Sequence, residues 1–222
     1  MLLPALNKAR EKSQGTSCLN NIKQLLLANN QYAGDYSVLC PVTVEDTSFY
    51  GGRHGEHGSY VFNLTSGGFL HHYLGNGSTV TICPTWEKMG RITDLTASSA
   101  AGGIGYNRLK WNSNIDLTDL SISNGRTKPE RIKRPSEITM FGDAAVGATP
   151  SAASFLCAKG AGGPAGNGSV HFRHGNLANI GWVDGHASTV SFQGGNSVVM
   201  TGYFDDTLKH FDPDYESGST AP

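Results

Sequence analysis

The first 36 residues carry the most regular hydrophobic pattern in the chain. A stripe of mostly apolar side chains recurs at spacings of three and four, and it is dense only from position 18 onward: Cys18, Ile22, Leu25, Leu26, Asn29, Tyr32, Ala33 and Tyr36. This spacing places side chains on one face of an α-helix. The pattern predicts one helix over residues 2–36, about 50 Å long. Because a domain of this size is narrower than that, we expect the second half to pack on the domain and the first half to protrude.

The start of this helix is apolar and is then charged. The sequence Met-Leu-Leu-Pro-Ala-Leu precedes a charged segment that begins at Lys8. Pro4 is compatible with a first helical turn, and Gly15 marks a possible bend. The apolar residues are too few for a membrane span or a signal peptide. They form either an ordinary first turn or the end of a longer hydrophobic segment, and both alternatives stay open.

After residue 36 the pattern predicts short elements separated by glycine-rich loops. We expect a helix over residues 68–74 closed by Gly75, a strand over 79–83 stopped by Pro84, and a loop over 96–124. Further strands are expected over residues 138–141, 170–173, 178–183 and 187–192.

The last three of these strands are separated by tight-turn sequences. The joints are Gly175-Asn176 and Asp184-Gly185, and such pairs favour a two-residue hairpin turn. The prediction is an antiparallel meander, and hence an α+β fold with a long N-terminal helix packed on an antiparallel β-sheet. The predicted organisation is a protruding helix over 1–36, a globular head over 37–204 and a polar tail over 205–222.

Composition and charge disfavour some classes of function. The chain has 222 residues, a net charge of −1 and a pI near 6.7, so no electrostatic surface for nucleic acid is expected. The basic residues between Arg126 and Arg134 are interpreted as a solvated loop. Cys18, Cys40, Cys83 and Cys157 have no CxxC spacing, which disfavours a zinc site. Two disulfides are possible in an oxidising compartment, with three possible pairings.

Two segments resemble a known family when they are taken together. The first is the opening helix, from Met-Leu-Leu-Pro-Ala-Leu-Asn-Lys-Ala-Arg through Ser-Cys-Leu-Asn-Asn-Ile-Lys-Gln at 17–24. The second is Arg173-His174-Gly175 followed by Val183-Asp184-Gly185-His186, with nine residues between His174 and Asp184. This combination resembles pseudopilin-like proteins with a prepilin-type N-terminus and a C-terminal H-x9-D-G motif.

The resemblance implies a pilin-like structural subunit of a type II secretion or type IV pilus-like assembly. Its partners would be other pilin-like subunits, bound through the N-terminal helix at Leu2, Leu3, Pro4 and Leu6. It further implies a single-pass inner-membrane anchor upstream, a periplasmic or extracellular head, no cofactor and no catalysis. The coding sequence before Met1 is then expected to encode a basic leader, a glycine and an apolar segment with a glutamate at its fifth mature position.

The motif residues His174, Asp184 and Gly185 are interpreted as structural. A strand over 178–183 with a turn at each end separates His174 from Asp184 by roughly 20 Å, too far for a shared metal or proton. We expect Asp184-Gly185 to form the turn and His174 to bond a neighbouring loop backbone. No catalytic or metal site is predicted, although Asp143, Asp184 and His186 near strand ends leave a cation site as an alternative.

A second function class is an extracytoplasmic module that binds carbohydrate or another cell-surface polymer. It would require Trp86, Trp111 and Trp182 to lie side by side on an exposed face, whereas core packing is the expected role of such scattered rings. His54 and His57 lie on a glycine-rich loop and lack the helical support of a zinc-binding HExxH site. We expect both histidines to be exposed polar residues.

Overall fold

The architecture is described from a computed structural model. It describes residues 2–40, 48–49, 52–54, 60–61, 70–75, 80–88, 102–107, 127–146, 151–153, 155–156, 169–196, 201–203 and 208–211. In chain order the helices are α1 (Leu2–Tyr36), α2 (His71–Leu74), α3 (Pro84–Lys88) and the 3-10 turns η2 (Pro129–Arg131) and η3 (Leu208–His210). The strands are β1 (Ser48–Phe49), β2 (Gly52–His54), β3 (Tyr60–Val61), β4 (Ile104–Asn107), β5 (Thr139–Val146), β6 (Ser151–Ala152), β7 (Phe155–Leu156), β8 (Ser169–His171), β9 (Leu177–Trp182), β10 (Ala187–Ser191), β11 (Gly194–Asn196) and β12 (Thr201–Tyr203).

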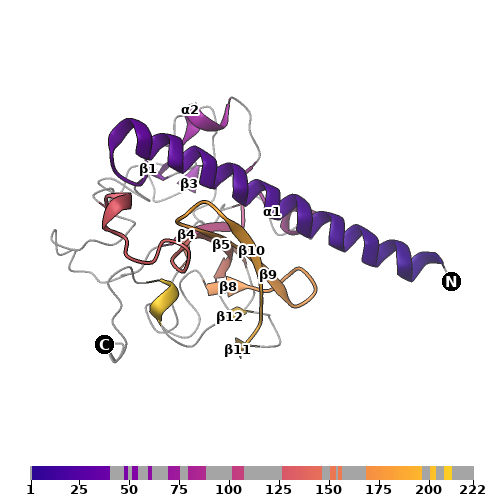
Figure 1. Ribbon diagram of the computed structural model, residues 1–222. Helices are drawn as coiled ribbons and strands as arrows, with labels where there is room; N and C mark the ends of the chain where they lie inside the picture. The colour runs from indigo at the N-terminus through magenta and orange to yellow at the C-terminus, as the bar shows by residue number, and fades with distance from the viewer. Residues whose placement is uncertain are drawn as a thin grey trace.

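Helix α1 lies across the head and extends well beyond it at the N-terminal end (Figure 1). Its first side chain inaccessible to solvent is Cys18, and burial then continues along the predicted stripe. Leu3 and Leu6 are 75% and 66% exposed. The predicted helix is therefore confirmed, and its first half extends beyond the head (Figure 1). Tyr36 departs from the predicted stripe, because it lies on the exposed side of the last turn.

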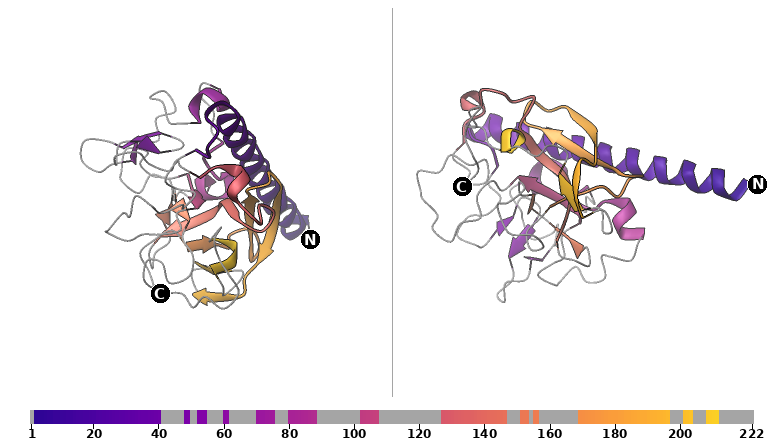
Figure 2. Two further views of the ribbon diagram at one scale, coloured as in Figure 1. Left: turned by 60° about the vertical axis from the view of Figure 1, so that its left-hand side comes forward. Right: turned by 90° about the horizontal axis from the view of Figure 1, so that it is seen from below.

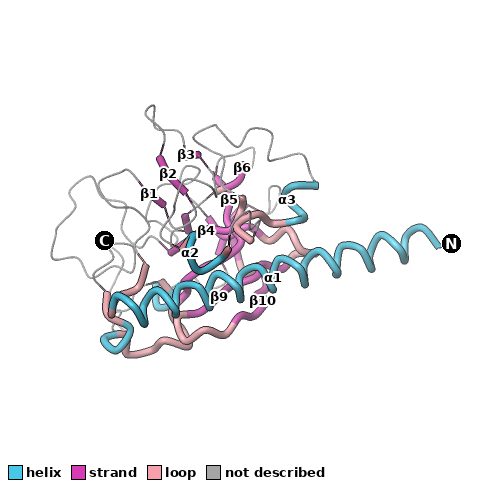
Figure 3. The backbone as a smooth tube through the Cα atoms, turned by 90° about the horizontal axis from the view of Figure 1, so that it is seen from above, coloured by secondary structure: helices cyan, strands magenta, loops and turns pink. Residues whose placement is uncertain are grey.

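The head is built on an antiparallel sheet whose central strand is β5. Its main order is β10-β9-β5-β8-β12-β11, and β4 and β6 also pair with β5. Strands β1, β2 and β3 form a separate small sheet. Figure 2 shows α1 along one side of the large sheet, and Figure 3 shows β9 and β10 beside the helix. The coarse α+β prediction, a long helix on an antiparallel sheet, is confirmed.

Buried side chains form two cores, one on each face of this sheet. The first lies under α1 and includes Ile22, Leu25, Met140 and Phe141. The second lies on the opposite face and includes Leu156, Val170, Phe172, Ile180 and Phe211. No described side chain of α1 belongs to this second core.

The central position of β5 overturns the predicted meander. Strands β9 and β10 form the expected hairpin, but β8 pairs with β5 and β12. The turn at Gly175-Asn176 does have positive φ at both residues, and its flanking pair is held by the hydrogen bond from His174 N to Leu177 O. Beyond that pair, β8 and β9 separate, because each strand pairs with a different part of β5.

Three smaller predictions are also wrong. Residues 80–83 contain only an isolated bridge at Ile82, and Pro84 begins α3, since proline is favoured in a first helical turn. The predicted loop over 96–124 contains β4, a buried strand in a segment of low hydrophobicity. The strand expected to end at Phe141 continues to Val146.

Part of the predicted tail packs on the head. Residues Leu208–His210 form η3, and Phe211 is buried in the second core. Among the described residues, no helix combines the length and the hydrophobicity that a bilayer crossing requires.

Candidate functional site

Strand β9 is the surface on which α1 rests. Gly181 faces the helix, and a Cβ built on it would lie 2.6 Å from Ile22 Cγ2 and 2.9 Å from Leu26 Cδ1. Contacts that short require the helix or its side chains to move, so only glycine permits this approach. The close packing of helix on strand is thus encoded at one position of β9.

The two ends of the H-x9-D-G motif contact two different turns of α1. At one end, the imidazole of His174 lies 3.5 Å from a Cβ built on Gly15, and Asn179 Nδ2 donates to Gly15 O at 3.1 Å. At the other end, Gly185 has φ +94° and lies against Asn30. The fifteen helical residues between Gly15 and Asn30 rise by about 22 Å. This agrees with the predicted separation of His174 from Asp184.

A gap in the pairing along β5 places Asp143 at the centre of the site. Strand β8 pairs with β5 up to Val170 and Ala144, and β9 resumes the pairing at Ile180 and Gly142. Opposite Asp143, the segment between Val170 and Ile180 is not paired with β5, while its strand residues stay paired with β12 and β10. That segment carries Arg173 and His174, and both side chains contact the Asp143 carboxylate.

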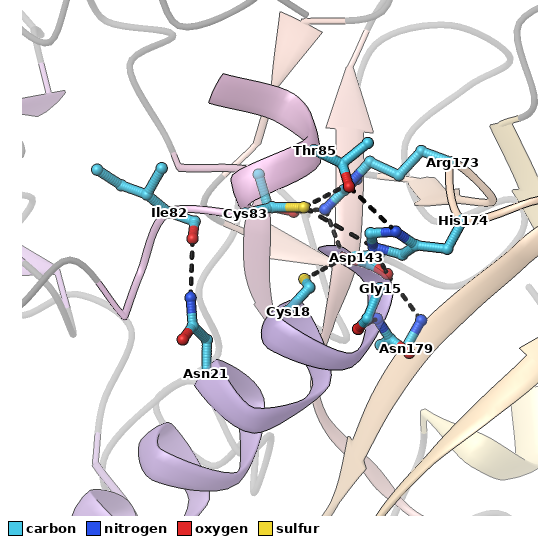
Figure 4. A network of polar contacts seen from close by, with 11 residues as sticks. Gly15, Cys18, Asn21, Ile82, Cys83, Thr85, Asp143, Arg173, His174 and Asn179 are labelled. Carbon is cyan, nitrogen blue, oxygen red and sulfur yellow. Dashed lines mark hydrogen bonds and ion pairs between the residues drawn. The ribbon is translucent and has the colours of Figure 1, made fainter. Parts of the chain in front are cut away.

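Three donor atoms, Sγ of Cys18, Sγ of Cys83 and Nε2 of His174, lie beside this buried carboxylate, which supplies the fourth (Figure 4). Cys18 Sγ of α1 lies 3.2 Å from Asp143 Oδ1, and His174 Nε2 lies 3.2 Å from Oδ2. Cys83 Sγ, just before α3, lies 3.7 Å from His174 Nε2. One ligand atom from each of the four residues lies within 4.8 Å of the other three, which is a grouping able to hold a metal ion. We call these four side chains the Cys–His–Asp cluster.

Arg173 supplies the positive charge next to the cluster. Its Nη2 lies 2.5 Å from Asp143 Oδ1, its Nε donates to Cys83 Sγ at 3.2 Å, and its guanidinium stacks 4.9 Å from the Trp86 ring centroid. Neither charged side chain of the Arg173–Asp143 pair is accessible to solvent. Breaking such a buried pair strands a charge, so both residues are needed together.

Burial and the local charges shift the pKa values of Asp143 and His174 in opposite directions. Burial raises the pKa of Asp143, but Arg173, His174 and the Asn179 N–H outweigh it and lower that pKa to about 2. Burial lowers the pKa of His174, but the charge and hydrogen bond of Asp143 raise it to about 9. In the metal-free protein the cluster therefore holds an ionised carboxylate beside a protonated imidazole.

The two thiols of the cluster differ in the direction of their pKa shifts. Burial raises the pKa of Cys18 well above its usual value. Burial would also raise the pKa of Cys83, but the Cys18 hydrogen bond, the Arg173 charge and the His174 hydrogen bond lower it well below that value. Cys83 is thus the thiol of the pair that loses its proton more easily.

The cluster does not have the geometry of a nucleophilic triad. A Cys–His–Asp triad needs the thiol at one imidazole nitrogen and the carboxylate at the other. Here both Cys83 and Asp143 approach His174 Nε2, while Thr85 Oγ1 lies 3.3 Å from Nδ1. The arrangement suits ligation or structural bonding better than proton relay.

The expected role of His174 is wrong in its detail. Its side chain contacts the carboxylate of Asp143, the Cys83 thiol and the Thr85 hydroxyl in place of a loop backbone. Only its backbone N–H bonds within the turn, to Leu177 O.

The alternative cation site of Asp143, Asp184 and His186 is not assembled. Asp184 Oδ1 contacts His186 Nδ1 at 2.6 Å, and its backbone N–H donates to Pro135 O, near the start of β5. The adjacent Val183 N donates to the carbonyl O of Ile138, the residue before β5. Asp143 lies five residues beyond Ile138, about 16 Å along the strand. Asp184 does form the expected turn, since its carboxylate accepts from His186 N, and Gly185 adopts the positive φ required there.

Trp86 and Trp182 do not form the exposed platform that the binding-module alternative needs. Trp86 and Trp182 are both buried, and they belong to different core regions. Trp111 lies outside the described residues, as do His57, Cys157 and the side chain of His54.

Sequence reasoning missed the Cys–His–Asp cluster because its members are distant in the chain. Cys18 and Asp143 are 125 residues apart, and Cys83 and His174 are 91 apart. The signal in the sequence was indirect: two cysteines, an aspartate after a strand, and the histidine of a motif. The chain was compared with protein families, curated proteins and solved structures, and none of these comparisons found a match.

Proposed function

We propose that this protein is a pseudopilin-like structural subunit that assembles with other pilin-like subunits through the leading half of α1. The proposal includes an inner-membrane anchor upstream, a head outside the cytoplasm, and a type II secretion or type IV pilus-like assembly. It rests on the resemblance of the opening helix and the H-x9-D-G motif, with the geometry of α1 as physical support.

The observation that carries the proposal is the contrast between the two halves of α1. From Cys18 onward the helix is fixed to the head by packing on β9 and by side-chain bonds such as Asn21 Nδ2 to Ile82 O at 3.0 Å. Before Gln14 the described side chains are exposed, including Leu3 and Leu6. Apolar side chains held rigidly in solvent are stabilised by contact with a partner.

The order along the exposed half fits an assembly surface next to a membrane. The apolar positions come first, at Leu3, Ala5 and Leu6, and charged residues follow from Lys8. Helix-to-helix packing would bury the leading leucines, while the charged turns stay near the head. A repeated heterologous contact of this kind produces a filament.

Site-specific cross-linking in the native cell, with the natural full-length gene, tests the proposal. We expect Leu6→Cys to give adducts with pilin-like subunits and Leu6→Arg to abolish assembly. The matched controls are Leu27→Cys and Leu27→Arg, since Leu27 is also exposed on α1 but lies on the half that is docked to the head. Absence of pilin-like partners in the Leu6→Cys adducts would refute the assembly role, as would an upstream coding sequence without any hydrophobic segment.

A further inference from the structure

We propose that Cys18, Cys83, Asp143 and His174 form a structural zinc site that ties α1 to the head. The proposal is independent of the assembly role, because it concerns only how the helix is attached within one chain. Its starting point is that four electron-rich donor atoms from four separate segments lie within 4.8 Å of one another.

Donors packed this closely need positive charge between them. Three donor–donor distances within the cluster, Cys18–Asp143, Asp143–His174 and His174–Cys83, are 3.2, 3.2 and 3.7 Å. A tetrahedral zinc site, with bonds of about 2.0–2.3 Å, has donor–donor edges of roughly 3.3–3.8 Å. These three distances, which involve both oxygens of Asp143, are therefore close to the edges of a zinc coordination shell, and all four donor atoms lie within 4.8 Å of one another. Without a metal, protons must bridge the same atoms.

The donor types select the metal. Two thiolates and an imidazole favour Zn²⁺ over Ca²⁺ or Mg²⁺, which prefer oxygen ligands. All four ligands come from the protein, which is typical of a structural site, whereas a catalytic zinc keeps one position open.

The surroundings supply the supporting contacts that zinc ligands need. Thr85 Oγ1 at His174 Nδ1 can accept that N–H, which leaves Nε2 bare and directed at the cluster. Arg173 donates to both Cys83 Sγ and the Asp143 carboxylate. Such donors to the ligand atoms hold the ligands in place and disperse their charge.

Charge is balanced when zinc is bound. The ion contributes +2 and Arg173 +1, while two thiolates and the Asp143 carboxylate contribute −3, so the buried site is neutral with His174 uncharged. Binding displaces the thiol protons and any imidazole proton into solvent. No oxidant or reductant is required.

The ligand positions indicate what the zinc would do. Cys18 is the first inaccessible residue of α1, where the helix meets the head, and the other ligands come from the segment before α3, from β5 and from the turn after β8. One ion would thereby connect the helix to three parts of the head at the base of the protruding half.

The test is metal analysis of the purified chain, followed by zinc titration and cobalt substitution. We expect one zinc per chain, and a Co²⁺ spectrum with a thiolate charge-transfer band and the visible bands of tetrahedral coordination. Cys83→Ser and Cys18→Ser should each weaken zinc binding by at least about 100-fold, and Thr85→Val by about 10-fold. Cys40→Ser is the matched control, because Cys40 is equally buried but outside the cluster, and it should bind zinc as the parent chain does.

Two results would overturn the proposal. One is a parent chain that takes up no zinc in the titration and gives no cobalt–thiolate band. The other is a Cys18–Cys83 disulfide in freshly isolated protein, since oxidised sulfurs cannot ligate zinc as thiolates. Because the parent chain is measured directly, neither result depends on whether a variant folds, and neither bears on filament assembly.

Discussion

Gly181 of β9 and Ile22 of α1 approach so closely that a methyl group on the glycine would lie 2.6 Å from Ile22 Cγ2. The contact lies at the middle of the helix–sheet interface, between the His174 and Gly185 ends of the motif. The position of α1 on β9 thus depends on the lack of a side chain at Gly181.

Replacing that glycine should loosen the attachment of α1. We expect Gly181→Ala to lower the free energy of unfolding by about 1–3 kcal/mol, because Ile22 and Leu26 must shift. Urea unfolding followed by circular dichroism measures the change. Gly34→Ala is the control, since a Cβ added to Gly34 would have no atom of another segment within 4 Å. It should stabilise the helix by about 0.5–1 kcal/mol, and equal destabilisation by both variants would contradict the packing argument.

A buried polar triangle fixes the other end of the docked helix. Asn29 Nδ2 donates to Tyr106 Oη at 3.1 Å, Tyr106 Oη donates to Cys40 O at 2.6 Å, and Cys40 N donates to Asn29 Oδ1 at 3.1 Å. Tyr106→Phe removes two of these bonds while keeping the ring. We expect a loss of about 1–3 kcal/mol, measured by urea unfolding, because the remaining polar groups stay buried. A change below a few tenths of a kcal/mol would show that the triangle adds nothing to stability.

The Arg173–Asp143 pair should behave as a unit. Asp143→Asn and Arg173→Met each strand one buried charge, and each is expected to cost about 3–5 kcal/mol. The double variant should cost clearly less than the sum, which a double-mutant cycle in stabilising osmolyte measures. Strict additivity of the two losses would mean that the two side chains do not depend on each other.

Acid should remove the contribution of Asp143 to stability. Its pKa is about 2 in the folded protein and 3.8 ordinarily, so its contribution is fully present above about pH 4 and is lost as the pH falls through 2. A difference of roughly two pKa units corresponds to about 2 kcal/mol. Unfolding of the metal-free protein at pH 5, 4, 3 and 2 should show this loss.

Two variants distinguish the contribution of Asp143 to the loss of stability in acid from the contributions of other carboxylates. Asp143→Asn should lack that part of the pH dependence. Glu137→Gln should retain it, because Glu137 forms only a surface ion pair with Arg134. If both variants followed the parent curve, another group would be responsible.

The sequence predicted the elements whose signals are local. The 2–36 helix follows from its three- and four-residue spacing, and the β9–β10 hairpin follows from Asp184-Gly185. Both depend on residues that are neighbours in the chain. The tight turn at Gly175-Asn176 was equally readable, but its sequence carries no sign that β5 occupies the place beside β8.

The features that were missed depend on distant partners. Strand β4 is only Ile-Gly-Tyr-Asn, and it is a strand because β5 pairs with it at Tyr106 and Phe141. The Cys–His–Asp cluster likewise exists only after α1, α3 and β5 are brought together. No spacing rule for metal ligands detects residues separated by 91 or 125 positions.

The packing of α1 on β9 makes the number of residues in the motif as important as their identity. Side chains alternate between the two faces of a strand, so deleting one residue between Leu177 and Gly181 would present a bulky neighbour to the helix where only a hydrogen atom fits. The nine-residue interval between His174 and Asp184 therefore sets the distance between the two contacts that position α1. A substitution at a position other than Gly181 keeps this register, whereas an insertion or deletion would displace the whole helix.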